Sequence, residues 1–531
     1  DVPLQQPFDA PTTVEEGYDA GDADPDSNKT FITMNWLLPE ITQQQRMMEL
    51  SVLSYALIGT PASPLRKALV DSGLGEDLTG SGLNGRMRQA VFEVGMKGTT
   101  YDNAPKVEAL ILETLGQLAE EGIERETVEA ALNTMEFRLR ERNTGRFPRG
   151  LMSAFTAFPL WANGGNPLDA LEFEERLAYV KQQFSDNEQY FQDLIGELLV
   201  QNTHRTTVIL RPDPEVGPRR DTATAEKLAQ LRSGMGSDEI TQIMEQQEAL
   251  RVAQETPDSP EDIAKLPTLT RDDIEREVKV TPQEISSIGE ATVYYHEQPT
   301  AGIAYVDLGF DLYTLPERLL PYVNIFGTAL TQVGTEAQDY VQLIQRIGRT
   351  TGGIYTTNFN AVKRDHESTL GLFFVRGKVT SDQTGDLLDL FRDILLTVKL
   401  DNKERLSQIV RQRRARFEQP GPFTPTGWAA KRLQARFNVA DWADEQMSGV
   451  SHLFFLRELV ERIDNDWDSV LADLEALREA LLKQGAMIVN ATMEADTWAS
   501  FKPQLEAFVG AIPAGDAPRQ AWGQGELPQY E

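Results

Sequence analysis

The amino-acid sequence predicts an α+β fold with two similar units, each an antiparallel sheet with helices packed on one face, joined by a helical connector. The first observation is a repeat: strand, helix, break, short helix, strand, paired helices and strand occur twice in this order. The second is that the long helices carry their apolar residues along one stripe, which needs a sheet or another helix to cover it. The third is a charged, proline-containing stretch that separates the two copies.

These patterns also divide the chain. With 531 residues, it is too long for a single hydrophobic core. We expect an extended lead-in at 1–29, a first α+β unit at 30–220, a connector arm at 221–280, a second α+β unit at 281–515 and a tail at 516–531.

The first unit is organised around the stretch 59–75, GTPASPLRKALVDSGLG. An apolar run with helical spacing at 48–58 precedes it. Pro61 ends that helix because it has no N–H to donate, and Ser63 with Pro64 begins a second, short helix as N-cap and first helical residue. The stretch therefore predicts a helix, a tight break and another helix.

The remaining elements follow from periodicity. In the first unit we expect strands at 31–38, 90–97 and 205–211, and helices at 105–121, 125–142 and within 168–200. In the second unit we expect strands at 301–312, 369–379 and 486–493, and helices at 320–333, 340–349, 384–398, 402–419 and 466–483. The connector should hold a charged helix at 238–254, after which three prolines exclude a long helix.

Charge and composition exclude several classes of function. The chain carries 51 basic and 82 acidic side chains, a formal charge of −31. Such a surface repels phosphate backbones and attracts basic, extended peptides, so we expect peptide partners and no nucleic acid. The alternative is that the acidic excess only keeps a large protein soluble. No apolar run has the length of a membrane span, so we expect no membrane partner.

Seven segments carry a resemblance to a known family. They stand in one order along the chain, at 59–75, 128–151 (VEAALNTMEFRLRERNTGRFPRGL), 204–215 (HRTTVILRPDPE), 254–274, 342–354 (QLIQRIGRTTGGI), 373–379 and 438–456. Together they resemble the presequence proteases, a branch of the pitrilysin/insulinase-type zinc metallopeptidases. The resemblance covers the central region only: the second and third of four units, and the helical arm that hinges the two halves of a clamshell.

The zinc site of that family is an H-x-x-E-H motif, in which two histidines bind the metal and the glutamate polarises a water. This chain has no cysteine, and none of its four histidines, at 204, 296, 366 and 452, begins such a motif. We therefore expect no metal and no catalytic residue in this chain, and zinc in the parent protease. Since residue 1 is Asp, a leader has been removed or the chain is a piece of a longer protein, and the resemblance favours the second.

One polar turn is a candidate for substrate contact. It leaves the long helix at 125–142, and the resemblance implies that Asn143, Arg146 and Arg149 face the chamber between the halves. The alternative is a helix terminus fixed by Asn143 and Gly145.

Other motifs are weak. Residues 80–85 (GSGLNG) fit the dinucleotide pattern G-x-G-x-x-G, but no buried strand precedes them and a strand follows, so we expect a flexible loop. Residues 348–353 lack the lysine of a phosphate loop and indicate a helix-ending turn. The arginines between 411 and 416 are expected to form ordinary surface ion pairs.

Two functional hypotheses follow. In the first, the chain is the non-catalytic central region of a presequence-protease-like zinc metalloendopeptidase that degrades short unfolded peptides, such as targeting peptides, in a closed chamber. Its partners would be basic peptides and the missing first and last units. In the second, it is a free-standing pitrilysin-like structural subunit that binds a catalytic partner chain. The resemblance implies a mitochondrial matrix, a plastid stroma or a bacterial cytoplasm.

Overall fold

The computed structural model describes residues 3–21, 24, 27–141, 145, 147–278, 280–365, 368–418 and 424–523. The chain forms two compact units, of which the larger contains both sheets and comprises Asp1–Glu16, Asp26–Leu210 and Gln283–Glu531. The smaller comprises Gly17–Pro25 and Arg211–Pro282. Within the described ranges, no helix is long and apolar enough to cross a membrane.

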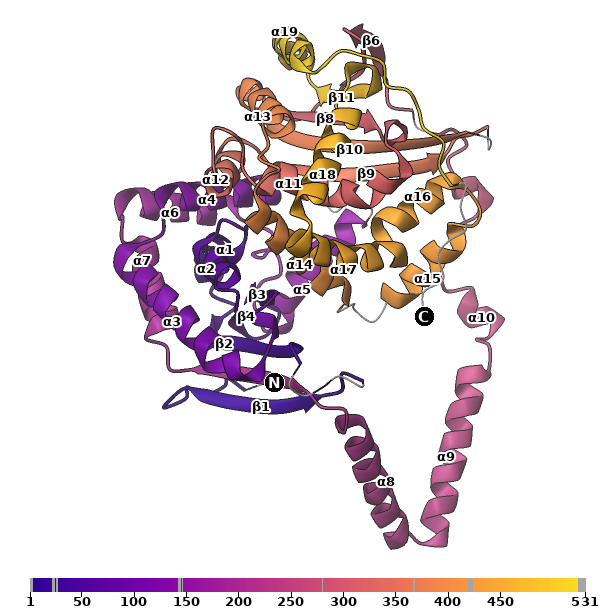
Figure 1. Ribbon diagram of the computed structural model, residues 1–531. Coiled ribbons are helices and arrows are strands. Elements are labelled where there is room, and N and C mark those ends of the chain that lie inside the picture. The colour runs from indigo at the N-terminus through magenta and orange to yellow at the C-terminus, as the bar shows by residue number, and fades with distance from the viewer. Residues whose placement is uncertain are drawn as a thin grey trace. The chain divides into compact units, whose positions relative to one another are not determined.

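The first sheet has five strands in the order β1-β5-β2-β4-β3 (Figure 1). Their bounds are β1 Thr12–Tyr18, β2 Thr30–Glu40, β3 Asp77–Asn84, β4 Gln89–Thr99 and β5 Arg205–Pro212. β5, β2, β4 and β3 pair antiparallel. Alternate residues of β2 are buried, as a period of two requires when one face of a sheet is covered.

The second sheet has six strands in the order β6-β7-β11-β8-β10-β9. Their bounds are β6 Glu284–Ile288, β7 Ala291–Glu297, β8 Ile303–Asp311, β9 Ile354–Val362, β10 Thr369–Thr380 and β11 Met487–Met493. β11 pairs parallel to β7 and antiparallel to β8. The expectation of a purely antiparallel sheet is therefore wrong at this one pair, because the last strand enters the sheet between two earlier ones.

The two sheets share one topology. The order β1-β5-β2-β4-β3 in the first corresponds strand for strand to β7-β11-β8-β10-β9 in the second, where β6 is an addition at the edge. This correspondence confirms the predicted α+β fold with two similar units. The boundaries 30–220 and 281–515 of the two units stay a prediction.

Helices cover the first sheet on its buried face. They are α1 Gln44–Ile58, α2 Pro64–Asp71, α3 Ala104–Glu121, α4 Arg125–Glu141, α6 Glu174–Asp186 and α7 Tyr190–Ile195, while α5 Arg149–Ala162 contributes no residue to their common core. Their apolar stripes and the inward face of β2 form one core around Trp36, whose indole N–H donates to the Leu199 carbonyl at 2.8 Å. We call this sheet and its helices the first module.

The second module is the second sheet with the helices that lie between its strands and after the last of them in the chain. They are α11 Val323–Gln332, α12 Tyr340–Thr350, α13 Thr384–Leu396, α14 Lys403–Glu418, α15 Thr424–Gln434, α16 Val439–Ser448, α17 Val450–Asn465, α18 Trp467–Leu481 and α19 Ala495–Ala511. A second core joins all of these helices except α15 to β7, β8, β10 and β11. A 3₁₀ helix, Glu317–Tyr322, precedes α11 where one continuous helix was expected, because Pro321 cannot continue an α-helical ladder.

The smaller compact unit is helical. It contains α8 Val216–Gly234, α9 Ser237–Glu255 and α10 Pro260–Ile263, drawn in magenta and pink in Figure 1. No residue of α9 is buried, so this helix depends on its own backbone and on pairs such as Arg251 with Glu248 and Glu255. Ser259 caps α10 by accepting from the Asp262 N–H at 3.2 Å.

The expectation of a flexible loop at 80–85 is wrong, because most of this stretch belongs to β3. The register of β3 against β4 shifts between Thr79 and Gly82, which is a β-bulge. Gly80 and Gly82 have φ of +85° and +76°, a conformation that side chains disfavour, so the glycines permit the bulge. The turn expected at the end of α12 is present, with Gly353 at φ +109°.

Candidate functional site

The two modules meet along a polar seam between α4 and α12. The Asn133 amide donates to the carbonyls of Gly348 at 2.7 Å and Thr351 at 3.0 Å, and so satisfies two groups at the end of α12. In the other direction, the Gln345 amide donates to Glu124 at 2.7 Å and to Thr127 at 3.0 Å. The seam is thus held by side chains that reach across in both directions.

Gly348 allows the two helices to approach closely. A Cβ atom at this position would lie 2.8 Å from the Cβ of Ala130, closer than two such atoms approach in proteins. The segments 128–151 and 342–354, which carry much of the family resemblance, therefore pack against one another.

Ion pairs extend the seam. From α14, Arg414 pairs with Glu76, and the Arg416 Nε donates to Asp77 at 3.0 Å. From β10, Lys378 pairs with Glu141 at the end of α4. These partners are far apart in the sequence, so no local pattern could indicate them.

The expectation of ordinary surface pairs at 411–416 is confirmed for Arg411, which pairs with Asp464, and in part for Arg414, which lies 3.7 Å from Glu418 one turn along the helix. It is wrong for Arg413 and Arg416. Arg414 and Arg416 reach across the seam. Arg413 is buried, and its Nε donates to the Nε2 of His452 at 3.0 Å. Burial lowers the pKa of Arg413 to about 10, and Arg416 nearby adds to that shift.

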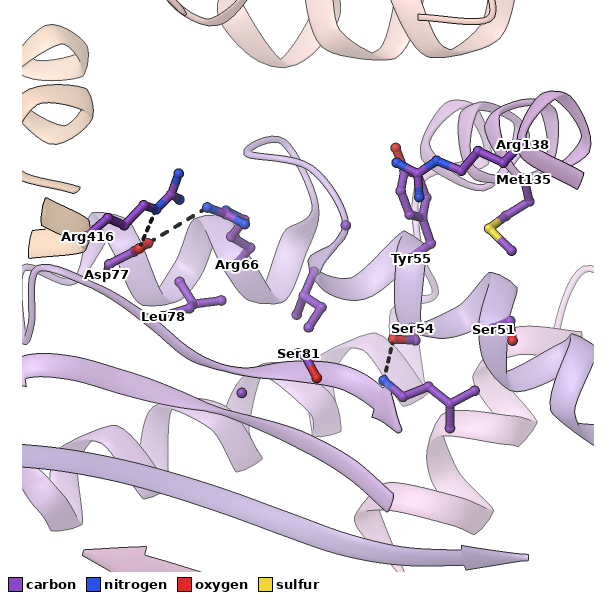
Figure 2. A pocket seen from close by; sticks show the side chains of 14 residues that line it. Ser51, Ser54, Tyr55, Arg66, Asp77, Leu78, Ser81, Met135, Arg138 and Arg416 are labelled. Atoms are coloured by element: carbon purple, nitrogen blue, oxygen red, sulfur yellow. Dashed lines mark hydrogen bonds and ion pairs between the residues drawn. The ribbon is translucent and has the colours of Figure 1, made fainter. Parts of the chain in front are cut away.

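A cavity of about 500 Å³ lies beside the seam (Figure 2). Four elements of the first module, α1, α2, β3 and α4, surround it, and α14 of the second module contributes Arg416. Its lining residues are Ser51, Ser54, Tyr55, Ile58, Gly59, Arg66, Asp77, Leu78, Gly80, Ser81, Leu83, Met135, Arg138 and Arg416.

The outer side of β3 faces this cavity. β3 is the last strand in the order of its sheet within the described part of the chain, so its other side pairs with β4. At the bulge, the Leu83 N–H donates away from β4 to the Ser54 hydroxyl of α1 at 3.0 Å; Ser54 is labelled in Figure 2. Leu78, Gly80 and Ser81 continue this wall toward Asp77.

Asp77 organises the charges at one end of the cavity. It is almost completely buried, with Arg416 Nε at 3.0 Å and Arg66 Nη2 at 3.8 Å. Burial lowers the pKa of Arg66, Asp77 opposes that shift, and Arg416 adds to it. The Nε of Arg66 is buried without a hydrogen-bond partner among the described atoms. One carboxylate therefore holds two guanidinium groups that keep unused donors.

At the other end lies Arg138. Its guanidinium lies 4.8 Å from the centre of the Tyr55 ring, a cation–π contact. Among the residues whose placement is described, no carboxylate pairs with it. Figure 2 shows this pair on the far side of the cavity from Asp77.

A second cavity of about 720 Å³ shares Ser51 and Arg138 with the first. Its walls come from α1, α4, α5, the segment 170–176, β9 and β10. Because they share Ser51 and Arg138, the two cavities lie next to one another, and we call them together the β3 groove.

Of the three residues predicted to contact substrate, the structure describes Arg149. Asn143 and Arg146 lie outside the described residues. Arg149 begins α5, is exposed, and lines the second cavity together with Arg138. A role for these three residues in substrate contact stays a prediction. Sequence reasoning missed Arg66, Asp77 and Arg138, because they come from separate elements and form no motif.

An exposed apolar surface lies on α5. Phe155, Phe158 and Trp161 are 57%, 59% and 63% exposed, although exposed aromatic side chains are usually scattered singly. Sequence analysis missed this helix, and its apolar residues at i, i+3 and i+6 were the available signal.

Two of the histidines contact an aromatic ring or an arginine side chain. The ring centre of His204 lies 4.0 Å from that of Phe8, at a tilt of 38°, and His452 is buried beside Arg413. His366 is outside the described residues. Within the described part of the chain, no three His, Cys, Asp or Glu side chains are grouped so that they could hold a metal ion.

The chain is similar to two family models and to several curated proteins. Residues 1–135 match the family model of the peptidase M16 inactive domain, and residues 210–459 match the model of the region associated with subfamily C of the same peptidases. Presequence protease 1, chloroplastic/mitochondrial, of Arabidopsis thaliana is 35% identical over 99% of this chain and 49% of its own length. The mitochondrial presequence protease of Xenopus laevis is 27% identical, over 98% of this chain and 50% of its own.

A bacterial relative, protein HypA of Clostridium perfringens, is 28% identical over 96% of this chain and 52% of its own length. The chain thus spans about half the length of the curated relatives it matches. Two models of this peptidase family match most of the chain, and the relatives align along nearly all of it. The chain belongs to the M16, or pitrilysin-type, peptidase family, in the branch of the presequence proteases.

Proposed function

We propose that this chain is the non-catalytic central region of a zinc metalloendopeptidase that degrades short unfolded peptides, such as targeting peptides, in a closed chamber. Its role is to form part of the chamber wall, to dock peptides, and to hinge the halves through the helical arm that contains α8 and α9. The docking role is supported by one observation: the outer side of β3 faces the β3 groove.

An edge strand beside a groove suits an extended peptide. Its main chain can add to the sheet by backbone hydrogen bonds, whatever its sequence, while alternate side chains enter the groove. This mode of binding fits a peptidase that accepts many unfolded substrates. The surplus of acidic side chains, −31 overall, would attract basic peptides from solution.

Bond cleavage is assigned to groups outside this chain. The family resemblance implies a zinc ion on an H-x-x-E-H helix in the first unit of the parent protease, and the 531 residues contain no such motif. The presequence proteases to which the chain is similar are about twice its length, which leaves room for that unit.

The test uses the chain as it is. We expect it to bind a fluorescent, basic, unfolded peptide of about twenty residues, measured by anisotropy, and to leave a fluorogenic peptide uncut in the presence of zinc. A failure to bind any peptide would contradict docking. Turnover that a chelator abolishes would contradict the assignment of catalysis to another unit.

A second candidate function is that of a free-standing structural subunit that binds a catalytic partner chain. The exposed aromatic face of α5 favours it, since such a surface suits a protein interface. Mass spectrometry of the source protein separates the two candidates. A longer polypeptide with H-x-x-E-H ahead of Asp1 supports the first candidate, and a native terminus at Asp1 supports the second.

A further inference from the structure

We infer that the cavity between Asp77 and Arg138 is a subsite for a peptide carboxylate. This inference rests on the proposed docking function and names the group that the docked peptide presents there. The peptide main chain would run from this cavity past Arg138 into the second cavity.

The charge of the cavity is the first argument. Arg66, Arg138 and Arg416 line it, and Asp77 is the one carboxylate among its lining residues. The chain as a whole carries −31. A local excess of two positive charges attracts an anionic group to this cavity, although the protein as a whole is acidic.

The unused donors are the second argument. Asp77 fixes Arg66 and Arg416 through contacts of 3.8 Å and 3.0 Å but occupies only part of their hydrogen-bonding capacity. The buried Nε of Arg66 has no partner among the described atoms. Arg66 and Arg416 therefore bring more positive charge to this end of the cavity than Asp77 offsets, which favours an incoming carboxylate.

Arg138 is the third argument. The Tyr55 ring holds its guanidinium in place, and no carboxylate of the described residues occupies it. It also stands where the two cavities join. A planar, preoriented guanidinium is suited to bind a carboxylate through two parallel hydrogen bonds.

A carboxylate can come from the peptide's C-terminus or from an Asp or Glu side chain. Both present two oxygens in one plane, so the cavity recognises their shared chemistry. Since every unmodified peptide has a terminal carboxylate, such a subsite gives an anchor that does not depend on sequence. It also lets the acidic surface attract the basic body of a peptide while the cavity holds its end.

The experiment measures binding of three N-terminally labelled peptides to the full 531-residue chain by anisotropy. They share one basic sequence and differ at the end: a free acid, an amide, and an amide whose last residue is Glu. We expect the free acid to bind roughly tenfold more tightly than the plain amide, as suits one added hydrogen-bonded charge pair. The Glu amide decides whether a side-chain carboxylate serves as well as the terminal one.

The variant Arg138→Gln should abolish the preference for the acid, because Gln cannot replace the guanidinium. The matched control is Arg140→Gln on the same helix, since Arg140 is exposed and pairs with Glu136 away from the cavity. Arg140→Gln should keep the preference. Thermal unfolding of both variants verifies that they are folded.

The outcomes separate the two proposals. Equal binding of all three peptides overturns the carboxylate subsite and leaves peptide docking in place. A preference for the acid that survives Arg138→Gln overturns the location. If no peptide binds, both the subsite and the docking function are wrong.

Discussion

His452 is a buried histidine of the second module that pairs with an arginine. It is completely buried, its Nε2 accepts from Arg413, and the rings of Phe417 and Phe455 lie 5.4 Å and 5.9 Å from its own. Burial lowers the pKa of His452 to about 3, with Arg413 and Lys431 contributing to the shift. The imidazole is therefore a neutral acceptor that fixes the Arg413 guanidinium.

This residue should make stability depend on pH. The folded chain keeps His452 neutral down to about pH 3, while the unfolded chain protonates it near its ordinary pKa of 6.5. The unfolded state thus binds more protons in this window, and the free energy of unfolding falls as the pH drops below 6.5. The expected loss is about 1.4 kcal/mol per pH unit, or roughly 2 kcal/mol by about pH 5.

His452→Gln keeps an acceptor for Arg413 and does not titrate. We expect urea unfolding of this variant to show a difference between about pH 7 and about pH 5 that is smaller by roughly 2 kcal/mol than in the natural chain. An unchanged difference would contradict the assignment of this pH dependence to His452.

At the scale of an element, the bulge in β3 positions the wall of the β3 groove. A Cβ atom on Gly82 would lie 2.3 Å from the Ser54 hydroxyl that accepts from Leu83, and φ at Gly82 is +76°. A side chain at this position therefore strains the backbone and displaces the contact between β3 and α1.

Gly82→Ala should lower the free energy of unfolding by roughly 1–3 kcal/mol and weaken peptide binding. The control is Gly116→Ala in α3, where nothing lies within 4 Å of the new Cβ. That change should stabilise the chain by roughly 0.5–1 kcal/mol, because alanine loses less entropy in a helix. Urea titrations of both variants measure the difference, and equal effects would speak against strain at the bulge.

Elements with strong periodicity could be predicted from the sequence, and edge strands could not. Alternating or continuously apolar residues predict the strands β2, β4, β8, β10 and β11. β1 is exposed almost throughout, and β3 is interrupted by two glycines. Such strands exist because a neighbouring strand offers hydrogen bonds, a cause that lies elsewhere in the chain.

The same limit applies to the β3 groove. The sequence of 59–75 predicts a break between helices, but it does not show that Arg66 in this stretch lies beside Asp77 and Arg416. These contacts join three elements from both modules. The lack of the family's zinc motif, in contrast, can be seen directly in the sequence, because the residues of that motif stand close together in the chain.

At the scale of the larger compact unit, the seam between α4 and α12 depends on small and polar residues. We expect Gly348→Leu to force the helices apart at Ala130 and to uncouple the modules, so that one cooperative thermal transition becomes two. Gly427→Leu in α15, where no atom lies within 4 Å of a new Cβ, should keep the transition of the natural chain. A single transition in both variants would show that the seam does not couple the modules.

The charge of the whole chain sets a prediction about rates. An excess of 31 negative charges should accelerate the encounter with a cationic peptide by long-range attraction. Raising salt from about 10 mM to about 150 mM shortens the Debye length from about 30 Å to about 8 Å. Stopped-flow association should then slow by roughly tenfold. A rate that does not change with salt would contradict this attraction and favour the alternative, that the acidic surplus only keeps the protein soluble.

The placement of β11 has a consequence for how the protein is made. This strand lies between β7 and β8, yet the ribosome delivers it long after both of them. Until then, both partners expose unpaired backbone, and the nascent second sheet is open down its middle. A growing polypeptide in this state is a client for chaperones, and a stop codon ahead of Met487 would release a product whose sheet can never close.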